Sequence, residues 1–326
     1  MAALAKDQIT NLITFGDSYT DVDLVWDGGI PWPKSAMQYV DASRTEDDGN
    51  STTSLDLYPF AKSGAVCSTD LTPSIYDSLN EKQLPAFYAN EENGTVPSTV
   101  TPDNSLYTLW IGTNDVGAWG LLTGHEIDNA TVVDTVQCAV NWVKMLYDRG
   151  ARNFVWQNAS DEMCDAEAKM IPLEYAPMYL PDAYPNKFTT EIKNATAWHL
   201  GMKELTSAGN EIAKLLLEDL VPSLEGAHVA GLFDSHELFS DIHEHPDAYL
   251  NGTAAFNVVD PTYSCIYEEL QDVTETVPCT TVEGTDRDSY MWWDELHPSE
   301  QTNRVLAKQI AEVILGKENK WTTWLS

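Results

Sequence analysis

Basic residues are scarce in this chain. Its 326 residues include only 18 Lys and Arg against 51 Asp and Glu, which gives a formal net charge of -33 at pH 7. A surface with so much negative charge repels nucleic-acid phosphates and anionic lipids over most of its area. The composition therefore argues against a nucleic-acid-binding protein and is typical of an acidic, soluble protein.

Long apolar stretches and a common lipase motif are also missing. No run approaches the ~20 apolar residues that span a bilayer, so we expect no membrane partner. The first residues, Met1 to Lys6, carry no apolar signal-peptide core. The chain has no Gly-x-Ser-x-Gly turn, which disfavours the common α/β-hydrolase lipases.

Cysteine is infrequent, with five residues in the chain. Cys265 and Cys279 bracket a polar, acidic loop and are the best candidates for a disulfide. The pairing of Cys67, Cys138 and Cys164 stays open, because connectivity cannot be read from sequence. Asn-x-Ser/Thr sites are numerous and favour a secreted, glycosylated protein. These sites are Asn50, Asn93, Asn129, Asn158, Asn194 and Asn251.

Strand-like apolar runs alternate with helical patterns, which is typical of a parallel sheet with helices on both faces. Residues 132–147 repeat apolar side chains at three- and four-residue spacing and predict a helix. Further helices are expected over 197–220 and after His297, with Pro298 near the start of the last one. We expect one domain over residues 1–326, with long loop insertions near 26–57 and 161–188. Strands are expected over 12–15, 105–111, 153–157 and 228–233.

A candidate nucleophile follows the first of these strands. The run ends at Gly16-Asp17-Ser18, and the Ser18 hydroxyl would need a base within hydrogen-bond reach. His297 suits this role, because Asp294 lies three residues earlier and can hold the Nδ1 proton while Nε2 faces the serine. Glu295 and backbone carbonyls are rival partners for this imidazole. The sequence therefore predicts Ser18, His297 and Asp294 as catalytic residues.

Acyl transfer also needs hydrogen-bond donors for the developing oxyanion. Asn114 follows a strongly apolar strand, which would place its amide at the carboxyl edge of the sheet. Gly64 can offer a backbone N–H that approaches closely because no Cβ blocks it.

Taken in chain order, these segments resemble the GDSL/SGNH hydrolase superfamily. Its blocks correspond to Gly16-Asp17-Ser18, to Gly64, to Gly112 with Asn114, and to Asp294 with His297, so the resemblance covers nearly the whole chain. It implies a three-layer, flavodoxin-like α/β sandwich with a central parallel sheet. It also implies an oxyanion hole formed by Ser18 N–H, Gly64 N–H and Asn114 Nδ2, with no metal and no cofactor.

The resemblance has one departure and one refinement. Family members often carry Asn-Tyr-Ala before the second-block glycine, whereas this chain has Pro59-Phe60-Ala61. The segments 16–21, 63–68 and 292–298 are most similar to fungal acetylesterases of carbohydrate esterase family 16. This implies a carboxylic ester hydrolase that removes acetyl groups through an acyl-enzyme.

Tryptophans near the predicted site suggest that the alcohol part of the ester substrate is a sugar. Indole faces suit sugar rings, so we expect substrate contacts from Trp26, Trp32, Trp119 and Trp293. The net charge of -33 disfavours polyanionic substrates. We therefore expect a monomeric esterase acting on acetylated, xylan-type hemicellulose oligosaccharides.

Three alternatives remain at this point. A secreted GDSL lipase or lysophospholipase would share every catalytic residue and is the main one. A metal-dependent hydrolase would use His and carboxylate ligands, but their spacing here does not support a metal-binding motif. An inactive carbohydrate-binding protein would have no need for a nucleophile together with its base. The metal ligands would come from His236, Glu237, Asp241, His243 and His245.

Overall fold

A six-stranded sheet lies at the centre of the computed structural model, which describes residues 4–25, 29–48, 54–157, 195–265 and 277–326. Its strand order is β10-β5-β4-β3-β1-β2, and only β10 runs antiparallel to its neighbour. The order β2-β1-β3-β4-β5 is that of flavodoxin-like sheets. The strands are β1 (Asn11–Gly16), β2 (Asp56–Pro59), β3 (Ser105–Trp110), β4 (Asn153–Gln157), β5 (His228–Phe233) and β10 (Thr322–Trp324).

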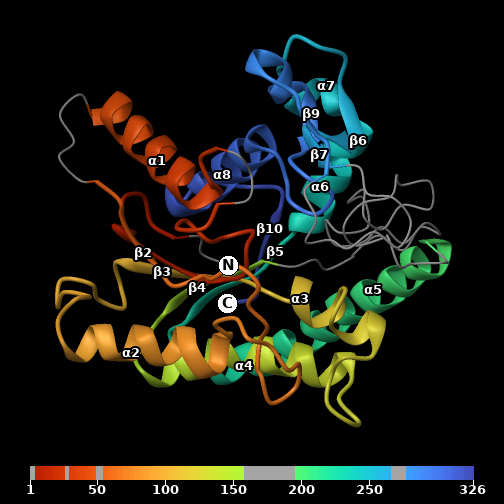
Figure 1. Ribbon diagram of the computed structural model, residues 1–326. Helices are drawn as coiled ribbons and strands as arrows, with labels where there is room; N and C mark the ends of the chain where they lie inside the picture. The colour runs from red at the N-terminus through yellow and green to blue at the C-terminus, as the bar shows by residue number, and fades with distance from the viewer. Residues whose placement is uncertain (1–3, 26–28, 49–53, 158–194, 266–276) are drawn as a thin grey trace.

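Helices cover both faces of this sheet (Figure 1). On one face α1 (Trp32–Asp48) packs against α8 (Glu300–Ile314), with α6 (Ser235–Glu244) beside them. On the other face lie α2 (Leu84–Glu92), α4 (Val132–Asp148) and α5 (Ala195–Leu220). Every residue of β1 and β3 is buried, because both faces of the strands are covered.

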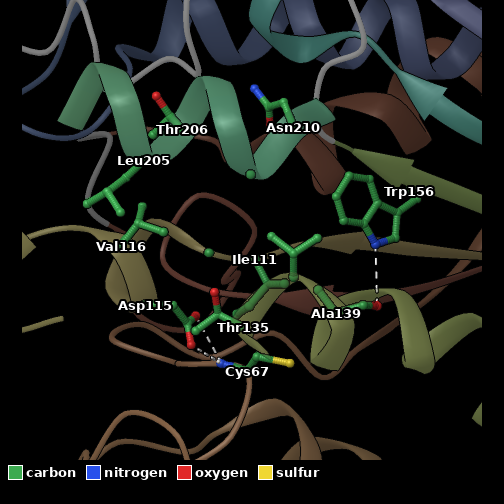
Figure 2. Close-up of a pocket in the computed structure, with 13 residues that line it drawn as sticks. Cys67, Ile111, Asp115, Val116, Thr135, Ala139, Trp156, Leu205, Thr206 and Asn210 are labelled. Carbon is green, nitrogen blue, oxygen red and sulfur yellow. Dashed lines mark hydrogen bonds between the residues drawn. The ribbon is translucent and has the colours of Figure 1, made fainter. Parts of the chain in front are cut away.

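The helices α4 and α5 also support the segment that follows β3. Val116, in α3 (Thr113–Val116), lies near Leu205 of α5 and Thr135 of α4 around a small pocket (Figure 2). The pocket holds only about 30 Å³, which is a water-sized space. The contact anchors α3 at the carboxyl edge of the sheet.

Short elements complete the described chain. A π-helical turn spans Leu79–Gln83, and 3-10 turns span Leu121–Thr123, Val221–Ser223 and Gly284–Ser289. The remaining helix is α7 (Pro246–Tyr249). Two small sheets pair β6 (Asn257–Pro261) with β9 (Tyr290–Trp292), and β7 (Tyr263–Cys265) with β8 (Cys279–Thr281).

The predicted α/β class and the main elements are confirmed, with two differences. Residues 26–57 are not one loop, because they contain α1 and β2. Trp32, Ala36 and Val40 in α1 are fully buried at four-residue spacing, with Met37 and Tyr39 partly buried against the same core. Pro298 lies outside α8, whose N-cap is Ser299. The predicted loop at 161–188 falls outside the described residues.

Two disulfides link the described cysteines. Cys265 bonds to Cys279 and joins β7 to β8, as the sequence predicts. Cys67 bonds to Cys138 and ties the segment after β2 to α4, a pairing that the sequence left open. No helix among the described residues is long and apolar enough to cross a membrane.

Candidate active site

The turn after β1 places Ser18 at the carboxyl edge of the sheet. Gly16 has a φ of 141°, and a Cβ there would come within 2.1 Å of the Trp110 carbonyl oxygen on β3, so only glycine fits. The turn closes as Thr20 N and Asp21 N donate to the Asp17 carbonyl at 3.0 Å each. Open α/β sheets bind ligands at this edge.

Ser18, His297 and Asp294 form a continuous hydrogen-bonded chain. His297 Nε2 lies 2.9 Å from Ser18 Oγ, and its Nδ1 lies 3.0 Å from each carboxylate oxygen of Asp294. Asp294 is 3% exposed and His297 is 6% exposed, which limits competition from water. Of the partners that the sequence offers, Asp294 contacts the imidazole. The arrangement can accept the serine proton and stabilise the resulting imidazolium.

The backbone of the 294–297 turn is fixed by its own acid. Asp294 Oδ1 accepts hydrogen bonds from Leu296 N at 2.8 Å and His297 N at 2.6 Å. The Tyr19 hydroxyl, from the nucleophile turn, donates to Leu296 O at 2.6 Å. This last bond ties the two catalytic segments together.

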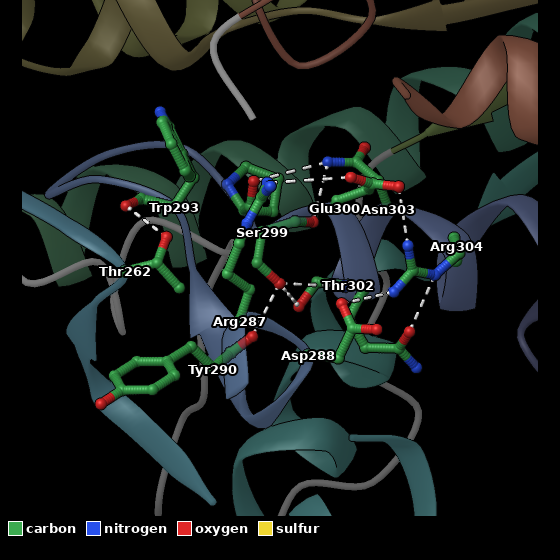
Figure 3. Close-up of polar contacts among 12 residues, drawn as sticks. Thr262, Arg287, Asp288, Tyr290, Trp293, Ser299, Glu300, Thr302, Asn303 and Arg304 are labelled. Atoms are coloured by element: carbon green, nitrogen blue, oxygen red, sulfur yellow. Dashed lines mark hydrogen bonds and ion pairs between the residues drawn. The ribbon is translucent and has the colours of Figure 1, made fainter. Parts of the chain in front are cut away.

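The start of α8 holds the same turn from the other side (Figure 3). Ser299 Oγ accepts from Thr302 N at 3.2 Å as the N-cap and donates to Tyr290 O at 2.7 Å. Trp293 N donates to His297 O at 2.8 Å. The cap and β9 together restrict the position of the imidazole.

The predicted oxyanion donors lie beside the nucleophile. Gly64 has a φ of 76°, and a Cβ there would lie 2.5 Å from the Tyr76 ring, so this position also requires glycine. Asn114, in the first turn of α3, donates from Nδ2 to Ala65 O at 2.9 Å. Both residues line one cavity with Ser18 and His297.

This cavity has a volume of about 810 Å³, far more than an acetyl group needs. Several of its apolar side chains are unusually exposed: Ile75 by 94%, Tyr76 by 57% and Leu24 by 53%. This wall could not be predicted from the sequence, because its residues form no periodic pattern. The further lining residues are Ser63, Val66, Thr72, Pro73, Ser74, Ala118 and Leu296.

The predicted substrate-binding tryptophans have separate outcomes. Trp119 lines the cavity, is 59% exposed and has a φ of 65°, which is rare for a residue other than glycine. Trp32 is fully buried and its indole N–H donates to Thr20 Oγ1, so the expected substrate contact is wrong for this core residue. Trp293 stacks on Tyr263 and is not among the cavity-lining residues. Trp26 lies outside the described residues.

The metal-site alternative gains no support from the described residues. Asp241 contacts His245 Nδ1 and Lys320 Nζ, each at 3.0 Å, so a lysine ammonium already neutralises this carboxylate. No group of three or more His, Cys, Asp or Glu in the described part of the chain could hold a metal ion.

Two buried carboxyl groups lie beneath the site. Burial raises the pKa of Asp17 to about 6 and that of Asp115 to about 7, and the proximity of Asp17 raises the latter further. Hydrogen bonds from Tyr19 N to Asp17 and from Cys67 N to Asp115 oppose the rise in each pKa.

These two groups predict a pH dependence of stability. A raised pKa of an acid means that the folded state binds protons that the unfolded state has lost, so this contribution is present below about pH 4 and is lost as pH rises through 6 to 7. Replacing Asp115 by Asn should therefore leave Tm unchanged at pH 4 and raise it by roughly 5 °C at pH 8. Thermal unfolding of both proteins across this range measures it. A constant Tm difference at all pH values would contradict the assignment.

Comparison with known proteins finds similarity to esterases and to a lipase/acylhydrolase family. The family model for GDSL-like lipase/acylhydrolase matches residues 12–310. An acetylesterase from Hypocrea jecorina is 29% identical, with 98% of this chain and 92% of the relative covered. An acetylesterase from Thermothelomyces thermophilus is 23% identical, with 94% and 88% covered. An acetylxylan esterase from Geobacillus stearothermophilus matches in structure with a TM-score of 0.44 and 11% identity, over 98% of this chain and 99% of that one.

Proposed function

This chain belongs to the GDSL-like lipase/acylhydrolase family and is an ester hydrolase, and we propose that it is a serine acetylesterase of acetylated, xylan-type oligosaccharides. The observation that carries the proposal is the 2.9 Å contact between His297 Nε2 and Ser18 Oγ, with Asp294 on the other ring nitrogen. A hydroxyl so placed can lose its proton as it attacks an ester carbonyl.

The reaction would proceed in two stages. Ser18 Oγ attacks the acetyl carbonyl while His297 takes the serine proton. The N–H groups of Ser18 and Gly64 and the Asn114 Nδ2 amide then donate hydrogen bonds to the oxyanion. His297 then gives its proton to the departing sugar oxygen, which leaves Ser18 acetylated. Water, deprotonated by the same imidazole, releases acetate and restores Ser18.

The carbohydrate side of the proposal rests on the cavity and the charge. Tyr76 and Trp119 expose more than half of their surface beside the nucleophile, and their flat faces can stack on the apolar faces of sugar rings. The net charge of -33 disfavours uronate-rich polymers and anionic lipids. Two fungal relatives over nearly the whole chain carry the name acetylesterase.

Secretion, glycosylation and a monomeric state are part of the proposal. Two disulfides favour an oxidising compartment. Asn93, Asn129 and Asn251 are exposed and accessible to glycosylation, whereas Asn50, Asn158 and Asn194 fall outside the described residues.

A substrate series tests the function. We expect the highest kcat/KM on acetyl esters, with acetate released from acetylated xylo-oligosaccharides, and lower values for nitrophenyl butyrate and octanoate. The apolar cavity wall makes this comparison necessary, because it could also hold an acyl chain. Preference for octanoate or for a lysophospholipid would assign the protein to the lipases instead.

A variant of Trp119 tests whether this residue contacts the sugar part of the substrate. Trp119→Ala should raise KM for the acetylated oligosaccharide by roughly 3- to 10-fold and change kcat/KM for nitrophenyl acetate little. Ile127→Ala is the matched control, because Ile127 is 42% exposed but does not line the cavity. Equal effects of the two variants would remove Trp119 from the substrate site.

A further inference from the structure

The segment 63–67, which carries Gly64, belongs to no helix or strand, yet buried carboxylates hold both of its ends. At one end, Asp21 Oδ2 accepts hydrogen bonds from Ser63 N at 2.8 Å and Ser63 Oγ at 3.0 Å. At the other end, both oxygens of Asp115 lie 3.0 Å from Cys67 N. Dashed lines mark these two contacts in Figure 2. Asp21 is 2% exposed and Asp115 is 1% exposed.

Each carboxylate connects this segment to another part of the active site. Asp21 is on the nucleophile turn, three residues after Ser18, and Asp115 follows Asn114 directly. Between the two ends, Ala65 O accepts the Asn114 amide at 2.9 Å. The segment is therefore fixed at three successive points, relative to the turns that carry Ser18 and Asn114.

We propose that Asp21 and Asp115 are positioning residues that aim the Gly64 N–H at the oxyanion formed on Ser18. Donors that stabilise an oxyanion must lie within about 0.5 Å of their working position to be effective. Because irregular backbone is held in place only by its contacts, these two carboxylates set the direction of the Gly64 N–H together with the Cys67–Cys138 disulfide and the backbone hydrogen bonds of Ala65 and Val66. The inference rests on the proposed esterase function and adds the residues that build its second donor.

The two carboxylates bind their partners differently, which gives a sharp test. Asp21 uses both oxygens as acceptors, Oδ2 for Ser63 and Oδ1 for Asp23 N at 2.8 Å and Leu24 N at 3.2 Å. An asparagine at this position would turn an NH2 group toward one of these sets of N–H donors. Both oxygens of Asp115 lie 3.0 Å from the same N–H, so an asparagine whose amide turns slightly can keep its carbonyl on Cys67 N and move its NH2 group away from this donor.

The experiment compares these variants by steady-state kinetics on nitrophenyl acetate. Asp21→Asn should lower kcat by roughly 10- to 100-fold with KM within about 2-fold, because the lost donor acts only on the transition state. Asp115→Asn should keep kcat within about 3-fold of the wild-type value. Asp115→Ala should lower kcat by about as much as Asp21→Asn does. If Asp115→Ala fails to fold, the two isosteric variants still decide the matter.

A matched control separates positioning from general stability. Asp41 Oδ1 accepts Leu55 N at 2.9 Å, a carboxylate contact to loop backbone outside the cavity, so Asp41→Ala should lower Tm without changing kcat. A folded Asp21→Asn variant with kcat within about 3-fold of the wild type would overturn the inference, as would equal losses in Asp115→Asn and Asp115→Ala. Ser18→Ala is the reference, since its retained activity would instead refute the proposed function.

Discussion

Replacing either Ser18 or His297 by alanine is expected to lower kcat by at least ~10⁴-fold, and the double variant is expected to be scarcely worse. The reason lies in the 2.9 Å contact between the two side chains, through which each depends on the other. Without the base the serine hydroxyl is a weak nucleophile, and without the serine the base has no proton to take. Acetate release under saturating substrate measures the effect.

Two controls sharpen this result. Asp294→Asn should be severe but leave residual turnover, because the amide can still contact the imidazole while favouring the wrong tautomer. Thermal unfolding should show that each variant remains folded. Losses that multiply in the double variant would mean that Ser18 and His297 act independently, which the hydrogen-bonded chain does not allow.

Asn114→Ala is expected to lower kcat by about 10² to 10³, or roughly 2.7 to 4 kcal/mol, with a smaller change in KM. Its amide lies in the cavity with Ser18, and the charge that it would stabilise appears only in the transition state. The loss includes the bond from Nδ2 to Ala65 O, which also orients the segment that carries Gly64.

Asn104→Ala is the matched control for this variant. Asn104 Nδ2 donates to Thr99 O at 2.9 Å, a similar amide-to-loop contact before the first residue of β3, at the amino edge of the sheet. Its removal should affect Tm rather than kcat. A raised KM with unchanged kcat in Asn114→Ala would assign this residue to ground-state binding instead.

The catalytic segments could be predicted from sequence because two glycines occupy backbone positions that other residues cannot adopt. Gly16 and Gly64 are required by backbone conformation and close contact, so their positions in the sequence carry structural information. Asp294 and His297 lie three residues apart on one turn, so their contact is local. These features allow most residues of the candidate site to be predicted from the sequence.

The cavity wall and the helix α1 could not be predicted. Ile75 and Tyr76 come from an irregular segment whose exposure depends on the tertiary structure alone. Trp32 and Trp119 are both tryptophans near the predicted site in the sequence, yet Trp32, the first residue of α1, is buried in the core and Trp119 lines the cavity. Nothing local distinguishes a buried indole from an exposed one, because burial is decided by distant partners such as α8.

The most direct measurement is labelling with a serine-reactive organophosphate, followed by mapping of the modified peptide. The hydrogen bond between Ser18 Oγ and His297 Nε2 predicts a single adduct on Ser18, formed at the rate at which esterase activity is lost. His297→Ala should not be labelled at a comparable rate. An adduct on Ser63 or Ser160, or loss of activity with Ser18 unmodified, would contradict the assignment of Ser18 as the nucleophile.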